Sequence, residues 1–138
     1  MTPVFHLAMP VQNLEDTRFF YGEVLRCKEG RSAPRWVDYN FFGHQLSFHV
    51  VESYSPVVGR NPVDGDAIGV PHFGVVLPWD SWESLAQTLA EFRIAFDVEP
   101  TVRFAGQPGE QGTFFVRDPS GNLLEFKTFR DPSNLFAT

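Results

Sequence analysis

Two apolar segments, FHLAMPV at residues 5–11 and PHFGVVL at residues 71–77, decide how this sequence divides. Each segment contains one histidine, His6 or His72. Each is followed by a residue that can cap a helix, by apolar residues at three- and four-residue spacing, and by three strand-like runs. This repeated order predicts two βαβββ modules and therefore a strand-dominated α+β fold.

In the first module, Asn13 is suited to the N-cap of a helix, because its side chain can accept a hydrogen bond from the first turn. Apolar residues recur on one helical face from Leu14 to Leu25, and the helix is expected to end before Gly30. Strands are expected at about residues 27–32, 36–41 and 45–51.

In the second module, Asp80 or Ser81 is expected to cap a helix whose apolar face includes Trp82 and Leu89. Residues 118–121, with the sequence DPSG, have the composition of a tight turn. Strands are expected at about residues 98–104, 113–117 and 123–128.

The chain of 138 residues is long enough for one domain. The expected parts are module 1 at about 1–52, a linker at about 53–70, module 2 at about 71–130 and a C-terminal tail at 131–138. Pro and Gly punctuate the linker, so it is predicted to be a linker or lid with little helix or strand. Residues 106–112 (GQPGEQG) are a second lid candidate for the same reason.

Composition excludes several classes of protein. The formal net charge is −6 and no basic run is present, which argues against a nucleic-acid partner. The single cysteine, Cys27, excludes an internal disulfide framework and multi-cysteine metal sites. Because neither a signal peptide nor a membrane-spanning apolar run is visible, we expect a soluble, cytoplasmic protein with no membrane partner.

Three residues are candidate metal ligands. If the modules pair about a pseudo-two-fold axis, His6 and His72 can face one point. Glu125 places a carboxylate within an apolar strand, where an ionised group is costly unless it has a partner. Two imidazoles and one carboxylate form the facial triad of non-haem Fe(II) sites, and the same set suits catalytic zinc. The alternative is that each is an ordinary hydrogen-bonded or solvated residue.

Five further residues are candidates for a catalytic or substrate pocket. Aligning the modules places Ser47 at the position of Glu125, and strand alternation sends His49 to the same face as Ser47. His49 is therefore a candidate ligand, ligand partner or acid–base group, and His44 is a second acid–base candidate at the pocket mouth. The alternatives are that His49 is a core histidine bonded to the backbone and that His44 is a solvent-facing turn residue. Arg103 is a candidate for binding an anionic group, and Phe115 for lining an apolar pocket.

Three motifs carry a family resemblance that covers nearly the whole chain. They are FHLAMPVQNLEDTRFFYGEVL at 5–25, PHFGVVL at 71–77 and DPSGNLLEF at 118–126. Together they resemble the vicinal oxygen chelate superfamily, which includes glyoxalase I, fosfomycin and bleomycin resistance proteins and extradiol dioxygenases. The resemblance implies an open, barrel-like mixed sheet around a central pocket, with His6, His72 and Glu125 at the ligand positions of a divalent metal.

The stretch RWVDYNFFGHQLSFH at residues 35–49 further resembles short extradiol-type dioxygenases. This implies Fe(II), O2 and a small catechol-like substrate, with His49 or His44 moving a proton. Ser47 stands where glyoxalase I has a carboxylate ligand, which argues against that enzyme. Phe115 stands where extradiol enzymes have a tyrosine, which argues against catechol cleavage.

Two alternatives to a dioxygenase stay open. The first is another metal-dependent enzyme of the superfamily, a lyase, isomerase or thiol transferase using Mn, Zn or Ni. The second is a non-catalytic protein that sequesters its ligand, as bleomycin resistance proteins do. Members of the superfamily often dimerise, so a homodimer is also expected.

Overall fold

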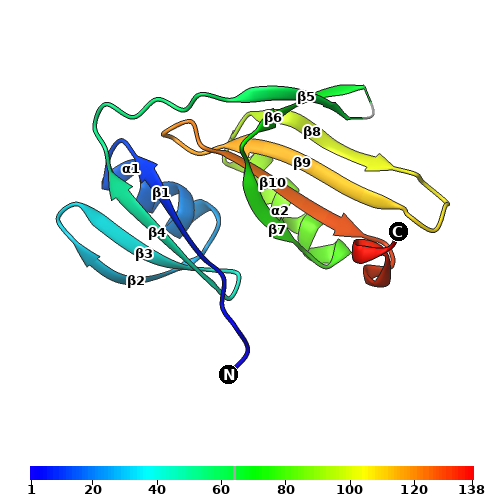
Figure 1. The fold of residues 1–138 in the computed structure, drawn as a ribbon, viewed down its shortest axis with the longest axis horizontal. Helices are drawn as coiled ribbons and strands as arrows, with labels where there is room; N and C mark the ends of the chain where they lie inside the picture. Colours follow the sequence, from blue (N-terminus) through cyan, green and yellow to red (C-terminus); the bar gives the residue numbers. More distant parts are fainter. Residues whose placement is uncertain (64) are drawn as a thin grey trace. The chain divides into compact units, whose positions relative to one another are not determined.

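The computed structural model describes residues 1–63 and 65–138, which form two compact units. The first unit contains Met1–Pro56 and Asp118–Asn122, and the second contains Val57–Arg117 and Leu123–Thr138. Each unit is built on one four-stranded mixed sheet with a helix from the same module (Figure 1). Asp64, which falls in the predicted linker, lies outside the described residues.

The sheet of the first unit has the strand order β1-β4-β3-β2. Its strands are β1 (His6–Val11), β2 (Lys28–Ala33), β3 (Trp36–Phe41) and β4 (His44–Val50). β1 pairs with β4 in parallel, whereas β4, β3 and β2 pair antiparallel. The predicted strands are therefore all present, within a few residues of the expected bounds.

The helix of the first unit begins as predicted at Asn13, whose side chain accepts a hydrogen bond from the backbone N–H of Asp16. It is α-helical only over α1 (Leu14–Arg18) and continues as a π-helix, η1 (Phe19–Val24). Tyr21 is fully buried, with its ring 4.3 Å from that of Phe48 on β4. This packing places the apolar face of the sheet against the helix.

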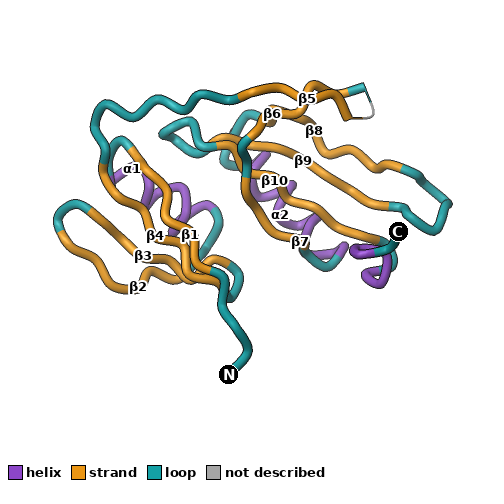
Figure 2. Tube along the Cα trace, in the orientation of Figure 1, coloured by secondary structure: helices purple, strands orange, loops and turns teal. Residues whose placement is uncertain are grey.

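The sheet of the second unit repeats the topology, with the order β7-β10-β9-β8. Its strands are β7 (Phe73–Val76), β8 (Phe96–Arg103), β9 (Gln111–Arg117) and β10 (Leu123–Phe129). β7 again pairs in parallel with the last strand of its module, β10. The predicted α+β fold with two βαβββ modules is thus confirmed (Figure 2).

The helix of the second unit, α2 (Trp79–Glu91), begins two or three residues earlier than the sequence suggested. Pro78 occupies the N-cap, and neither Asp80 nor Ser81 caps the helix. Proline has no backbone N–H, so it fits a helix start, where that donor has no helical partner. Trp82 is buried, and its indole N–H donates to the carbonyl of Phe126 at 2.9 Å, which ties α2 to β10.

The predicted linker and the C-terminal tail contain regular structure. Residues 53–70 include the antiparallel hairpin β5 (Gly59–Val63) and β6 (Asp66–Val70), so the expectation of little helix or strand was wrong there. Backbone pairing forms this hairpin without the apolar alternation that the sequence analysis required. The C-terminal tail contains a 3-10 helix, η2 (Pro132–Phe136). None of the helices in the described ranges is long and apolar enough to cross a membrane.

Candidate functional site

The second unit brings two of the predicted metal ligands into contact. His72 directly precedes β7, and Glu125 lies within β10, where β7 is its parallel neighbour. The His72 Nε2 atom lies 3.1 Å from the Glu125 Oε1 atom. Their side chains are 26% and 16% exposed, so the pair is largely shielded and still open to a small ligand.

The other nitrogen of His72 fixes the chemistry of this contact. His72 Nδ1 lies 2.7 Å from the carbonyl oxygen of Gly69. A carbonyl oxygen can only accept, so Nδ1 carries the proton in this bond. In the neutral imidazole, Nε2 would then present a lone pair to the carboxylate, and two acceptors would face each other at 3.1 Å. The pair therefore requires a proton or a cation between its members.

The pKa values of the pair follow the same logic. The hydrogen bond to Glu125 raises the pKa of His72 above its ordinary value, against the opposing effect of burial. Burial alone would raise the pKa of Glu125, but hydrogen bonds from His72 and Thr113 and the charge of Lys127 outweigh it and lower the pKa. Both shifts favour the charged forms, an imidazolium beside a carboxylate.

Neighbouring residues hold the Glu125 carboxylate in place. The Thr113 hydroxyl donates to Glu125 Oε2 at 2.6 Å, and Thr113 is only 3% exposed. On the other side, Gly74 is the register partner of Glu125 in the β7–β10 ladder. A Cβ atom at residue 74 would collide with the backbone carbonyl of Glu125, so the close strand approach requires glycine.

The His72–Glu125 pair lines a cavity of about 360 Å³ within the second unit, hereafter the second-unit cavity. Its apolar wall is formed by Val63, Ile68, Phe104 and Phe115. Its polar lining is formed by His72, Arg103, Gln111, Thr113, Glu125 and Lys127. This mixture suits a small molecule with an apolar body and a few polar groups.

Phe115 and Arg103 both line this cavity, in agreement with their prediction as pocket residues. Phe115 is 2% exposed and meets the His72 ring edge-on, with centroids 5.0 Å apart. Arg103 is bound to Asp66 Oδ2 at 2.8 Å, and its side chain is only 11% exposed. Asp66 belongs to the hairpin that the sequence analysis took for an irregular linker.

In the first unit, His6 lies on the sheet face that does not pack against the helix. Its register partner on β4 is Gln45, and Ala8 is likewise opposite Ser47. Residues in register project to the same face, so His6, Gln45 and Ser47 share it. His6 is exposed. Because His6 and the His72–Glu125 pair belong to different units, its role as the third ligand stays a prediction.

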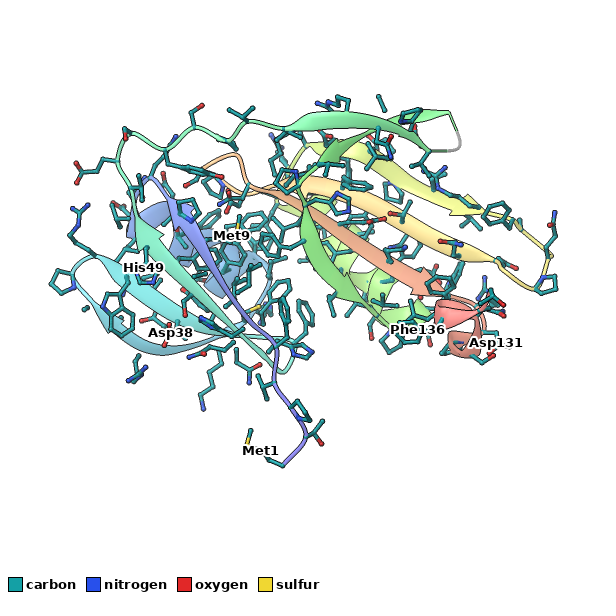
Figure 3. The ribbon with its side chains drawn as sticks, in the orientation of Figure 1. Met1, Met9, Asp38, His49, Asp131 and Phe136 are labelled. Atoms are coloured by element: carbon teal, nitrogen blue, oxygen red, sulfur yellow. The ribbon has the colours of Figure 1, made fainter. Side chains whose placement is uncertain are left out.

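Ser47 is bound to a carboxylate that the sequence analysis did not single out. The Ser47 hydroxyl donates to Asp38 Oδ1 at 2.6 Å, and Gln45 Nε2 donates to Asp38 Oδ2 at 3.4 Å. Asp38 is only 7% exposed although it lies on the polar face of β3 (Figure 3). The acidic residue within WVDYN was the available signal, because a charge at mid-strand needs partners.

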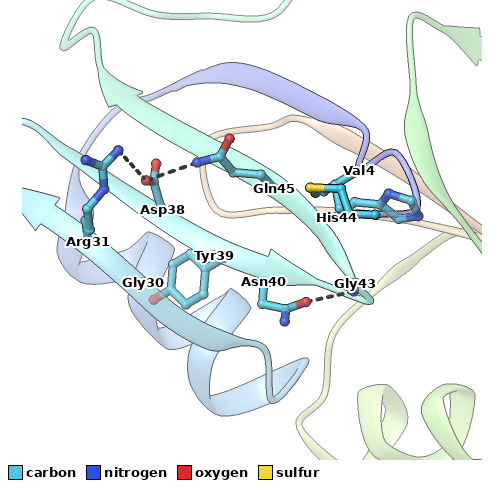
Figure 4. Close-up of a pocket in the computed structure, with 10 residues that line it drawn as sticks. Val4, Gly30, Arg31, Asp38, Tyr39, Asn40, Gly43, His44 and Gln45 are labelled. Carbon is cyan, nitrogen blue, oxygen red and sulfur yellow. Dashed lines mark hydrogen bonds and ion pairs between the residues drawn. The ribbon is translucent and has the colours of Figure 1, made fainter.

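The two candidate acid–base histidines lie at opposite ends of β4. His44 Nδ1 accepts a hydrogen bond from the backbone N–H of Phe5 at 3.1 Å, so in the neutral imidazole the proton lies on Nε2. His44 also lines a first-unit cavity of about 480 Å³ that includes Asp38 and Gln45 (Figure 4). His49 is exposed, and its ring lies 6.5 Å from that of Trp36.

Within residues 1–63 and 65–138, three or more metal-binding side chains are not gathered into a single group. The structure therefore brings together two of the three predicted ligands. Two functional neighbours, Thr113 and Lys127, were missed by the sequence analysis. Both lie on the same face of their strands as Phe115 and Glu125, two residues away, so strand alternation was sufficient to find them.

The family comparison agrees with the geometry of the fold. The model of the glyoxalase/bleomycin resistance protein/dioxygenase superfamily matches residues 4–126. The chain belongs to this superfamily, whose members have the vicinal oxygen chelate fold.

Solved structures with the same fold cover almost the whole chain. A glyoxalase/bleomycin resistance protein/dioxygenase from Alicyclobacillus acidocaldarius is 33% identical, covering 98% of this chain and 97% of that chain with a TM-score of 0.79. The fosfomycin resistance protein FosX from Listeria monocytogenes is 14% identical, covering 93% of each chain with a TM-score of 0.68. Lactoylglutathione lyase from Agrobacterium tumefaciens is 14% identical, covering 93% of this chain and 94% of that chain with a TM-score of 0.63. The last two show likeness of fold alone.

Proposed function

We propose that this protein is a metal-dependent enzyme of extradiol-dioxygenase type that acts on a small substrate with two adjacent oxygen atoms. His72 and Glu125 are two ligands of a divalent metal, with Fe(II) favoured, and His6 is the third. The observation that carries the proposal is the 3.1 Å contact between His72 Nε2 and Glu125 Oε1 in the wall of a cavity of substrate size.

The residues present fit a divalent metal by the chemistry of their donors. The bond from Nδ1 to the Gly69 carbonyl orients the imidazole so that Nε2 is the ligating atom. The Thr113 hydroxyl binds one oxygen of Glu125 and leaves the other toward His72. Histidine and carboxylate ligands of metals ordinarily form such second hydrogen bonds, here to a carbonyl oxygen and from a hydroxyl group, which hold the ligand in position.

The remaining side chains have separable roles in such an enzyme. A bound metal would act as a Lewis acid and as a template for the two substrate oxygens. Phe115 and Ile68 exclude water from one wall of the second-unit cavity and contact an apolar substrate body. His44 and His49 are the candidates for moving a substrate hydroxyl proton, because each is an exposed imidazole.

One observation favours a second candidate function within the superfamily. Phe115 packs against His72 and has no hydroxyl group. The extradiol enzymes that this chain resembles have a tyrosine at the corresponding position. A metal-dependent lyase, isomerase or thiol transferase needs no such group. Such an enzyme would use Mn, Zn or Ni and would consume no O2.

Metal analysis of protein purified anaerobically without chelators tests the proposal. Wild type is expected to contain about one metal per chain, and Glu125→Gln is expected to lose most of it. Glu99→Gln is the matched control, since Glu99 is an exposed glutamate on β8 of the same unit. Iron together with O2 uptake in the presence of catechols would support the dioxygenase assignment.

The other outcomes separate the alternatives. If wild type contains zinc, manganese or nickel and consumes no O2, the result would favour the second candidate function over the dioxygenase. No metal in wild type, even after reconstitution with each ion, would overturn the metal-enzyme proposal and favour a ligand-sequestering protein. Light scattering during size-exclusion chromatography tests the proposed homodimer, and fractionation of the native host tests the proposed cytoplasmic location.

A further inference from the structure

The first-unit cavity of about 480 Å³ contains a buried carboxylate that the proposed metal site does not use. Asp38 lines this cavity from β3, and its side chain is only 10% exposed. An ionised carboxylate at such a position is costly unless a cation or hydrogen-bond donors compensate its charge. The residues described as lining the cavity do not include the proposed ligands His6, His72 and Glu125. The metal site therefore does not explain the charge of Asp38.

The two oxygen atoms of Asp38 are compensated unequally. Oδ1 accepts a hydrogen bond of 2.6 Å from the Ser47 hydroxyl. Oδ2 lies 3.4 Å from Gln45 Nε2 and 3.8 Å from the nearest nitrogen of Arg31. Hydrogen bonds from N–H to oxygen ordinarily measure about 2.7–3.2 Å, and a carboxylate accepts such bonds on both oxygens. Oδ2 is thus the oxygen with the weaker contacts.

Arg31 is a loose partner for this carboxylate. Its side chain is 82% exposed, and its guanidinium carbon lies 5.8 Å from the centre of the Trp36 ring. Water screens an ion pair in which one member is so exposed, so the pair contributes little. A ligand cation that approaches Oδ2 more closely can take its place while the Arg31 side chain turns to solvent.

A glycine leaves Asp38 uncovered on the side of β2. Gly30 lines the cavity, and a Cβ atom at residue 30 would lie 3.4 Å from the Asp38 Cβ atom, which is an ordinary contact. A larger residue would therefore fit beside Asp38 and cover its carboxylate. Because residue 30 is glycine, the carboxylate borders open cavity space.

The shape of the cavity suits a small organic molecule. Asp38, Arg31 and Gln45 lie near one end of it (Figure 4). Val4 and His44 lie near the other end. The volume is within the range of small-molecule sites. In the described part of the chain no three metal-binding side chains gather, so a single carboxylate here fits an organic cation better than a metal ion, which needs several ligands.

We infer that the first-unit cavity binds a small organic cation whose N–H donors, on an ammonium, amidinium or guanidinium group, bond to Asp38 Oδ2. The body of the ligand extends toward Val4 and His44. Asp38 supplies the charge, and Gly30 supplies the space beside it. This inference goes beyond the proposed function, because it depends neither on the metal nor on the reaction.

Titration with three small probes tests the inference. Benzamidine, benzamide and benzoate share one ring and nearly one shape, and they are positive, neutral and negative at neutral pH. Each is titrated into full-length, isotope-labelled protein and followed by NMR, which gives the affinity and the residues affected. Wild type is expected to bind benzamidine about tenfold more tightly than benzamide, the factor typical of a charge-assisted hydrogen bond. The backbone amide signals of Gly30, Asp38 and Gly43, which line the cavity, are expected to shift.

Two pairs of variants separate the charge of Asp38 from the space beside it. Asp38→Asn is expected to abolish most of the preference for benzamidine. Asp16→Asn, at an exposed aspartate of the same unit, is expected to keep it. Gly30→Val keeps the carboxylate but covers it, so it is expected to lose most of the benzamidine binding, with a smaller loss in Gly30→Ala.

A further variant tests the loose ion pair. Arg31→Gln is expected to bind benzamidine at least as tightly as wild type and up to about fivefold more tightly, because the exposed ion pair that competes with the probe is weak. A preference of wild type for benzoate that disappears in Arg31→Gln would make this cavity an anion site and would overturn the inference.

Two other results would also overturn it. One is equal affinity of wild type for benzamidine and benzamide, and the other is an unchanged preference in both Asp38→Asn and Gly30→Val. Metal content is measured in every sample, and the preference is expected to be the same whatever that content is. A preference that rises and falls with the metal content would contradict binding at Asp38. If wild type contains no metal but the preference persists, the proposed function fails and the cation site stands.

Discussion

The backbone of Gly74 on β7 lies directly against the backbone carbonyl of Glu125 on β10, at a distance that leaves no room for a side chain. The two residues are register partners in the parallel ladder that also holds His72 beside the Glu125 carboxylate. Any residue larger than glycine must therefore move the strand that carries the proposed ligand.

The first prediction concerns this contact. Gly74→Ala is expected to destabilise the protein by about 1–3 kcal/mol or more, because the collision is with backbone and cannot be relieved by a rotamer change. It should also reduce metal content by displacing Glu125. Chemical denaturation and metal analysis measure the two effects. Gly109→Ala, at a glycine with open space around it, is the control and should change stability by less than about 0.5 kcal/mol.

A second prediction concerns the hydroxyl behind the carboxylate. Thr113→Val removes the 2.6 Å hydrogen bond to Glu125 Oε2 without changing the shape of the buried side chain. Metal affinity is expected to fall about 10- to 100-fold, as for other supports of metal ligands. Competition with a chelator of known affinity measures it. Thr101→Val is the control, because the Thr101 hydroxyl binds the nearby Glu99 carbonyl instead. Equal affinities in the two variants would contradict a supporting role for Thr113.

A third prediction separates Ser47 from the metal ligands. Ser47→Ala removes the closest donor to the buried Asp38 carboxylate and is expected to lower stability by about 1–3 kcal/mol. Metal content should stay at the wild-type value, since Ser47 is not among the proposed ligands. Metal content is measured in the same samples as the denaturation curve. Loss of the metal in this variant would indicate that the Asp38–Ser47 pair, and not His6, contributes the ligand from the first unit.

A fourth prediction concerns the pH dependence of stability. Burial raises the pKa of Asp118, although hydrogen bonds from Asn122, Tyr21 and Ser120 oppose the shift. A carboxyl group whose pKa is higher in the folded state than in the unfolded state stabilises the fold when protonated, and this contribution is lost as pH rises through the folded pKa. The contribution is complete below the unfolded value of about 4.

Asp118→Asn removes that titration. The free energy of unfolding of wild type minus that of Asp118→Asn is expected to be largest below about pH 4 and to shrink as pH rises through the raised pKa. Urea denaturation at a series of pH values measures the difference. Asp80→Asn, at an exposed aspartate of α2, is the control for the loss of one carboxylate. A difference that grows with pH for Asp118→Asn would show that its folded pKa is lowered instead.

Local sequence signals predicted the elements of both modules well. The Asn13 cap and the strand at 36–41 were found because capping and strand alternation depend on a few neighbouring residues. The hairpin at 59–70 was missed because its pairing is between backbone groups, and its residues show no apolar alternation. The π-helical second half of the first helix was missed because its apolar spacing is also that of an α-helix.

The candidate site was only partly predictable for a similar reason. Glu125 and His72 could be singled out because charged or titratable side chains in apolar segments need partners. The bonds from His72 to Gly69 and from Thr113 to Glu125 could not, since each depends on the register of strands that are far apart in sequence. The ion pair between Arg103 and Asp66 joins a strand to the hairpin that the sequence left irregular.

The sequence by itself determined the two βαβββ modules, the residue types available for a metal site and the superfamily to which the chain belongs. Only the tertiary structure decided that His72 meets Glu125 with its Nε2 atom, that Thr113 holds the carboxylate, and that Arg103 and Lys127 share one cavity. The physical reason is that helix and strand patterns are set by neighbouring residues, whereas a binding site is set by contacts between segments that only folding brings together.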